Sequence, residues 1–358
     1  MLGRHLQTTA ACLIAGVMLI AACGEESDSG GVGVDDPEEA VLAAFDAIDT
    51  DVSEMTITFD GDGADLADAL EAMDDTFPAD EPGTDTMVEL MAGAELRASA
   101  SGENLAMAVV LDDTSLTEMR VIGSTLYGRI DLDSALSLIG DIDPEAASEF
   151  EMMVGMAPMI AAEDPRLGFV QDLLEGRWIS MEVPDDAESS DLFDDTSDTE
   201  TLDEEMLSVI EEVLSANTAV THVGDARGGQ QFVIEVDVAS TMAALARNPM
   251  AAQALDLTDS STDPDELVEE MQSEGMASTW EFDVVVTDGV ISSVGMDLAT
   301  LSTEAPDGAS LPVLIRLSPS PSAPEAPDDH TPIPPELFEE LAGDMMGDLG
   351  PMGDMSGL

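Results

Sequence analysis

Three carboxylates in the segment DGDGADLADALE have the spacing of a calcium-binding loop. Asp60 and Asp62 stand two residues apart, and Glu71 follows eleven residues after Asp60. However, Ala64 takes a ligand position and Asp65 takes the place of the required glycine. The segment before the loop also alternates like a strand, whereas a helix would be required there. We therefore predict no specific metal site here.

Other groups that could carry catalysis are sparse. Beyond the N-terminal segment the chain has His222, in an expected strand, and His330, in a proline-rich stretch. Two distant histidines assemble neither a metal cluster nor a catalytic triad. The sequence also lacks a G-x-S-x-G elbow and a phosphate-binding glycine loop. We predict that the protein is not an enzyme, with no catalytic, cofactor-binding or metal-binding residues and no cofactor.

Methionine is the one other group with a distinctive distribution. Met152, Met153, Met156 and Met159 lie in one expected helix. Because methionine adapts to irregular apolar partners, they could form the lid or wall of a ligand cavity or pack in an ordinary core, and we favour core packing. The C-terminal segment MMGDLGPMGDM offers thioethers for Cu(I), but a disordered tail explains it without a metal.

The N-terminus has the organisation of a secretory signal peptide. Residues 1–22 combine a basic head containing Arg4 and His5 with an apolar core of 13 residues, 10–22. A helix needs about 20 apolar residues to cross a bilayer. The apolar core is therefore too short for a permanent membrane span.

The thiol of Cys23 follows this segment directly. Ile20-Ala21-Ala22-Cys23 resembles a bacterial lipobox, in which the cysteine is diacylated and becomes the first residue of the mature chain. Cys12, the other cysteine, would leave with the signal peptide, so the mature chain would contain no disulfide. Two acyl chains suffice for stable anchoring. We predict lipidation at Cys23 and a lipoprotein on the extracytoplasmic side of the cell membrane.

The charge of the chain excludes one class of partner. Its 78 carboxylates oppose nine arginines and no lysine, giving a formal net charge of −69. Nucleic acids require positive charge, so we exclude them as partners. With 44% hydrophobic residues the chain can still bury a sizeable core. The acidity is explained equally by adaptation to high salt, which screens self-repulsion, and by an ordinary solvated surface.

Alternating apolar residues predict most of the strands. They place these side chains on one face of each strand: Met55, Ile57 and Phe59; Leu105, Met107, Val109 and Leu111; Phe232, Ile234, Val236 and Val238; Trp280, Phe282, Val284 and Val286. Short glycine turns are expected at Ser101-Gly102, Gly123-Ser124, Gly228-Gly229 and Asp288-Gly289. Such turns join neighbouring strands as hairpins, so we predict an antiparallel sheet.

Helical spacing predicts helices in residues 37–50, from 133 to about 176, and in 204–216, with strands at 177–183 and 311–318. Residues 185–205 hold eleven carboxylates in 21 positions and predict a solvated loop. The predicted organisation is a signal peptide (1–22), an acidic flexible tether (23–36), an α+β domain (37–318) and a mostly disordered tail rich in proline, glycine and methionine (319–358).

This order of elements resembles that of the LppX/LprG-type envelope lipoproteins, which are relatives of the LolA-like lipid carriers. Gly176-Arg177-Trp178 is similar to a family motif, and so is the aromatic-rich strand with its turn from Trp280 to Gly289. The resemblance covers residues 37–318. It implies an α+β fold in which an antiparallel, half-open β-barrel has helices over its concave face and an apolar cavity that takes up acyl chains.

We therefore predict a non-catalytic, lipid-anchored carrier or binding protein of the cell envelope. The diacylglyceryl group would anchor it to the membrane, with palmitate as a typical acyl chain. Its ligand would be a lipid or another amphiphile. The alternative is a structural lipoprotein that uses the same fold as a scaffold for envelope proteins and binds no small ligand.

Overall fold

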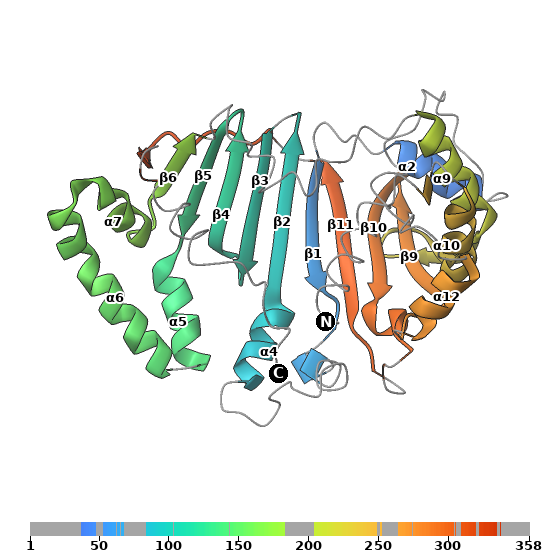
Figure 1. Cartoon of the computed structure of the whole chain (residues 1–358), viewed down its shortest axis with the longest axis horizontal. Helices are drawn as coiled ribbons and strands as arrows, with labels where there is room; N and C mark the ends of the chain where they lie inside the picture. Colours follow the sequence, from blue (N-terminus) through green and yellow to red (C-terminus); the bar gives the residue numbers. More distant parts are fainter. Residues whose placement is uncertain are drawn as a thin grey trace, which may run out of the picture.

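The chain forms one large sheet with helices standing on it (Figure 1). The computed structural model describes residues 37–47, 53–61, 63–64, 66–67, 84–102, 104–142, 144–182, 204–248, 251–252, 264–273, 275–303, 305, 309–319, 322–334 and 337. The predictions for residues 1–36, including Cys23, and for most of the acidic loop at 185–205 lie outside this set.

Most of the predicted elements are present. The helices are α2 (Pro37–Asp46), α4 (Thr84–Gly93), α5 (Leu132–Ile142), α6 (Pro144–Glu163), α7 (Gly168–Leu174), α9 (Glu204–Ala216), α10 (Val238–Arg247) and α12 (Pro264–Ser273), with short 3-10 turns η1 (Pro165–Leu167) and η2 (Leu298–Leu301). The strands are β1 (Ser53–Phe59), β2 (Ala94–Ser101), β3 (Asn104–Leu111), β4 (Thr114–Ile122), β5 (Thr125–Ile130), β6 (Trp178–Glu182), β7 (Thr218–Ala226), β8 (Gly229–Asp237), β9 (Thr279–Thr287), β10 (Val290–Asp297), β11 (Pro312–Pro319) and β12 (His330–Pro332).

The sheet is open and almost wholly antiparallel. Its strand order is β12-β6-β5-β4-β3-β2-β1-β11-β10-β9-β8-β7, and β12, which runs parallel to β6, is the one exception. The predicted hairpins are confirmed, because Gly102, Gly123, Gly228 and Gly289 all have the positive φ that such turns require. The structure therefore confirms an α+β fold with an antiparallel sheet.

β11 holds the two halves of the sheet together. Residues 313–319 of β11 pair with β1, for example Ile315 with Ile57, and on its other side Ile315 pairs with Val294 of β10. β1–β6 lie to one side of this junction and β7–β10 to the other (Figure 1). The last long strand thus sits in the middle of the sheet.

Aspartates start the helices that follow strands. The Asp131 side chain accepts a hydrogen bond from the Ser134 backbone N–H (3.1 Å) at the start of α5. Asp237 does the same for Ser240 (2.9 Å) at the start of α10. Each carboxylate satisfies a backbone donor that the first helical turn leaves unpaired. The chain can therefore leave the sheet at these points without burying an unsatisfied polar group.

The core is concentrated at the β7–β11 end. Here α2 touches both β7 and β10, which lie three strands apart, so the sheet curves around this helix. Val41 and Phe45 of α2 pack against Phe232, Trp280 and other buried residues of β8–β10, and α10 and α12 add Met242 and Met271 at the margin. Helices thus cover the apolar face of this half of the sheet.

The predicted domain end at residue 318 needs correction. Residues 322–334 continue along the sheet, where Arg120 donates a hydrogen bond to the Glu325 carbonyl (2.8 Å). Beyond it β12 pairs with β6, and the Ile333 backbone N–H donates to the Ser180 carbonyl (2.8 Å). Three residues among prolines carry no recognisable strand period, because this strand forms only against the exposed edge of β6. The ordered domain therefore includes part of the predicted tail.

Phe232 and Phe59 provide a matched test of where the stability resides. Both face the apolar side of the sheet, but Phe232 is fully buried under helices, whereas Phe59 is half-buried. We expect Phe232→Ala to lower the free energy of unfolding by about 3–5 kcal/mol, the usual cost of a large cavity in a core, and Phe59→Ala to cost less than half as much. Urea unfolding of both variants measures this. Equal costs would contradict a core concentrated at one end.

Candidate functional site

The two faces of the sheet differ in chemistry across β1–β5. The pairing registers place Met55, Ala98, Met107, Met119 and Gly128 side by side across β1–β5. Residues one position along each strand point to the opposite face, and these include Glu54, Arg97, Arg120 and Arg129. One face is therefore apolar, and the other carries charges.

The apolar face continues across almost the whole sheet but is covered in only one half. From β8 to β10 its residues are buried, for instance Phe282 at 5% and Val284 at 1% exposure. From β1 to β5 its residues are only half-buried. We call this second part the open floor, and it comprises Met55, Ile57, Phe59, Leu96, Ala98, Ala100, Leu105, Met107, Val109, Leu111, Met119, Val121, Leu126 and Gly128.

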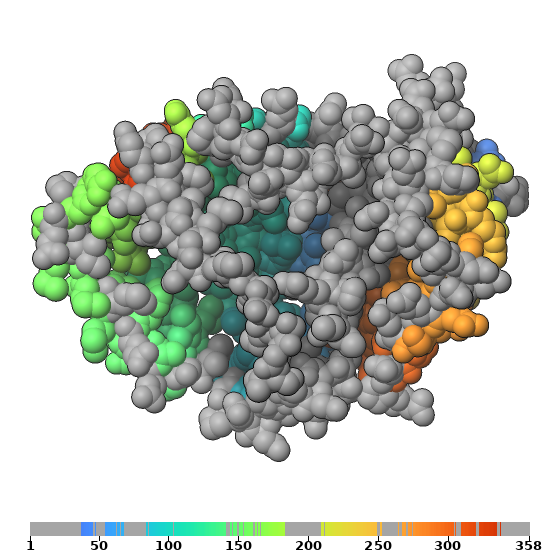
Figure 2. Space-filling view, in the orientation of Figure 1, coloured from blue at the N-terminus to red at the C-terminus, as the bar shows by residue number. Residues whose placement is uncertain are grey.

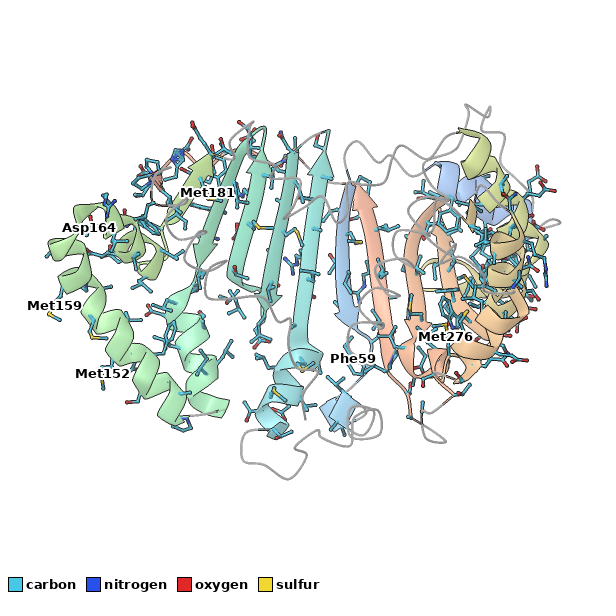
Figure 3. All side chains as sticks on the ribbon, viewed as in Figure 1. Phe59, Met152, Met159, Asp164, Met181 and Met276 are labelled. Atoms are coloured by element: carbon cyan, nitrogen blue, oxygen red, sulfur yellow. The ribbon has the colours of Figure 1, made fainter. Side chains whose placement is uncertain are left out.

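The surroundings of the open floor give it the form of a shallow basin. In Figure 2 the atoms of β1–β4 lie in a hollow between the α5 and α6 side and the β10 and α12 side. A Cβ atom at Gly128 would meet no heavy atom of the described chain within 4 Å. Phe59 and Met181, labelled in Figure 3, lie near opposite ends of this half of the sheet. The basin is lined by side chains without charge and can receive apolar groups.

The charged face carries a network around Trp178. The guanidinium carbons of Arg120 and Arg129 lie 4.6 Å and 5.2 Å from the centre of the indole ring, a cation–π geometry. Glu118 bridges these arginines, forming a 3.3 Å ion pair with Arg120 and a short contact with Arg129. Burial alone would raise the pKa of Glu118, but hydrogen bonds and the charge of Arg129 lower it overall. The network holds β4, β5 and β6 in register.

A groove of about 370 Å³ lies on this charged face. Its walls include Glu54, Arg97 and Arg120, and residues 322–325 form its outer side. Arg97 is already paired with Glu95 at 2.6 Å, and this hydrogen bond raises the pKa of the arginine further. Because its arginines are neutralised by neighbouring carboxylates, the groove offers no net positive site for an anion.

The residues considered for metal binding and catalysis do not come together. Asp60 forms a 2.5 Å ion pair with Arg227, and Asp62 and Glu71 lie outside the described residues. His222 of β7 packs beside Phe232 of β8, with ring centres 5.2 Å apart. His330 stacks on Tyr127 at the other end of the sheet, at 5.1 Å. Within the described chain, no three His, Cys, Asp or Glu side chains lie close enough to hold a metal ion.

Two buried polar atoms on the apolar face have no hydrogen-bond partner within the described chain. They are Nε2 of His222 and Nε1 of Trp280, and both side chains lie at the covered end of the sheet. Buried polar groups are normally paired. Among the described residues, these are the two buried side-chain polar atoms that the structure leaves without a hydrogen-bond partner.

The favoured prediction of core packing is wrong for three of the four methionines of α6, and the side chain of Met153 lies outside the described residues. Met152, Met156 and Met159 are 68%, 42% and 64% exposed, so they are not packed in a core. The helix packs mainly against α5, α7 and η1. Hydrophobic spacing shows that a helix has an apolar face but does not show whether any partner covers that face.

These features define a class of protein: an α+β protein with an open, mostly antiparallel sheet whose apolar face is covered by helices in one half. Among the described residues, none of the helices has the length and apolar character needed to cross a bilayer. No protein-family model matches the chain, and no curated protein matches its sequence.

The solved structure of the lipoprotein LppX from Mycobacterium tuberculosis is similar to this chain at a distant level. The match covers 78% of this chain and 92% of that chain, with 10% sequence identity and a TM-score of 0.29. A match this distant carries no conclusion about function, which has to be argued from this chain's own residues.

Glu118 should make the stability of this half depend on pH. Its pKa is lower in the folded than in the unfolded chain, so its contribution is present above about pH 4.5 and is lost as the pH falls through the folded-state pKa. We expect Glu118→Gln to cost about 1–2 kcal/mol of unfolding free energy at pH 7 and much less at pH 3. Unfolding at both pH values measures this, with the exposed Glu182→Gln on β6 as the control. A cost independent of pH would contradict the assignment.

Proposed function

We propose that the protein is a lipid-anchored extracytoplasmic lipoprotein that binds or carries a lipid or another amphiphile and performs no catalysis. The observation that supports this best is the open floor, a surface of fourteen uncharged positions on a chain with 78 carboxylates. Leaving so much apolar surface partly uncovered is unfavourable in water. An acyl chain lying on the open floor would remove that surface from water.

The sheet geometry supports a ligand that lies flat along the strands. At the β7–β10 end the sheet already curves around α2. In this proposal a similar curvature over the open floor completes the half-open barrel that the sequence resemblance implies, with bound acyl chains taking the place that helices occupy at the other end. Strands of eight or nine residues are about 27 Å long, enough to accommodate a long acyl chain.

The N-terminal segment supports the anchoring part of the proposal. The lipobox-like Ile20-Ala21-Ala22-Cys23 provides one thiol for acylation. Acyl chains on Cys23 would hold the folded body at the membrane surface, where lipid ligands are available. The charge of −69 disfavours direct adsorption to anionic head groups, so an acyl anchor would supply the attachment that the body lacks.

Filling the open floor tests the binding function. Ala98 of β2 lies on the apolar face, and Ala106, on the adjacent β3, lies on the charged face; both are half-buried. We expect Ala98→Phe, or Gly128→Leu, to reduce co-purifying lipid severalfold because the new side chain occupies the volume of an acyl chain, whereas Ala106→Phe retains it.

The measurement is mass spectrometry of organic extracts from the soluble chain that begins at Gly24, with circular dichroism to establish that each variant folds. Unchanged lipid content in both floor variants, or no amphiphile in any preparation, would reject the carrier. In the second case a crosslinking pull-down would show whether the chain acts as a protein scaffold.

Replacing Cys23 with serine tests the anchor. Without the thiol no acyl group can be attached and processing at Cys23 cannot follow, so we expect the full-length variant to carry no acyl mass and to retain its signal peptide. Detergent partitioning and intact-mass measurement detect both changes. A wild-type chain that carries no acyl mass at its N-terminus would contradict the lipoprotein assignment but would leave the binding test unaffected.

A further inference from the structure

The outer face of α6 is an exposed apolar surface that the open floor does not explain. Met152, Met156 and Met159 follow each other at i, i+4 and i+7, so they form one stripe along the helix. In Figure 3 the labelled Met152 and Met159 point away from the sheet. We call this row the methionine stripe.

The methionine stripe also lies in a segment of the chain that carries no charged residue. Residues 152–162 contain no Asp, Glu or Arg, although the whole chain has 78 carboxylates in 358 residues. The nearest charged residues in the sequence are Glu151 on one side and Glu163 and Asp164 on the other. Asp164 is paired with Arg166 at 2.6 Å. An apolar side chain on a surface is ordinary, but a charge-free row of exposed methionines on so acidic a chain is not.

The chemistry of the stripe fits a lipid surface better than a protein partner. Protein interfaces are also enriched in methionine, but they surround it with a polar rim and form about one hydrogen bond per 100–200 Å². Among the residues whose side chains are described in 152–162, the exposed ones are Met152, Gly155, Met156, Pro158, Met159 and Ala162, none of which is polar. Flexible thioether side chains can enter the disordered boundary between head groups and acyl chains. Elsewhere the acidic surface is repelled by anionic head groups. The methionine stripe is therefore where contact with a bilayer meets the least electrostatic repulsion.

The position of α6 links such a contact to the proposed ligand site. α6 packs on α5 and α7, and these helices stand beside the half of the sheet that carries the open floor (Figures 1 and 2). A bilayer that touches the methionine stripe would therefore lie on the outer side of the helices that border the open basin.

We propose that the methionine stripe of α6 is the surface through which the folded body contacts the bilayer when it loads or releases its ligand. This rests on the proposed carrier function and adds the site of membrane contact. The contact is apolar and weak. It operates alongside the acyl anchor, and salt modulates it only through the repulsion between the acidic body and anionic lipids.

The test compares Met152→Glu/Met156→Glu/Met159→Glu with the control Met91→Glu, another exposed methionine, on α4 (45% exposed). The soluble chain from Gly24 is mixed with vesicles of zwitterionic phosphatidylcholine or with vesicles that contain phosphatidylglycerol. We expect the triple variant to lose at least about tenfold in vesicle partitioning, as expected when several apolar side chains can no longer be buried, and Met91→Glu to change it less than twofold. Partitioning of the wild type to the anionic vesicles should rise with salt.

Uptake of a fluorescent fatty acid from solution, without vesicles, separates this proposal from the carrier function. Normal uptake with lost vesicle partitioning and slower vesicle-to-protein transfer supports the stripe as the contact surface. Unchanged partitioning of the triple variant overturns the stripe, whatever the uptake. Absence of uptake in the wild type overturns the carrier function and with it the role of the stripe in ligand exchange, whereas vesicle partitioning still tests the membrane contact by itself. Concentration-dependent dimerisation of the wild type that the triple variant loses, without vesicle partitioning, would assign the stripe to self-association and overturn the proposal.

Discussion

A sheet with one apolar face must have that face covered, and the rest of this structure depends on how that requirement is met. At the β7–β11 end, α2, α10 and α12 provide the cover and create a core that includes Phe232, Val284 and Ile291, each at most 1% exposed. At the β1–β5 end the same face is only half-buried. Because β11 pairs with both β1 and β10, the well-packed half fixes the position of the less covered half. The open floor can then keep its shape although no complete hydrophobic core covers it.

Sequence patterns were sufficient for the strands and hairpins but not for their order. Alternation in residues 104–111 identifies β3 and its apolar face correctly, because a half-buried strand has only two faces to distinguish. The pairing of residues 53–59 with 313–319 could not be predicted, since it joins segments more than 250 residues apart and no local pattern records which strands become neighbours. Asp131 and Asp237, each three residues before a serine, are local signals for the helix starts that could have been recognised.

The sequence predicted the apolar character of the candidate site but not its place on the sheet. The residues of the open floor appear in the sequence as ordinary core positions, and only the placement of the helices shows that one half is less covered. For the same reason the methionines of α6 were assigned to the core, although three of them are exposed. The ion pairs around Trp178 were also missed, because Glu118, Arg120 and Arg129 become neighbours of the indole only across β4, β5 and β6.

The functional interpretation of the apolar surfaces depends on the distribution of charge. Four of the nine arginines, Arg97, Arg120, Arg129 and Arg316, lie on the charged face of the sheet, where Glu95 and Glu118 partner three of them. This pairing neutralises Glu95 and Glu118 on the sheet, but nine arginines cannot neutralise 78 carboxylates. Such a surface repels other acidic molecules and keeps the chain soluble. The open floor and the methionine stripe are thus partly exposed apolar surfaces on a body whose charge opposes aggregation, a combination that favours reversible contact with amphiphiles.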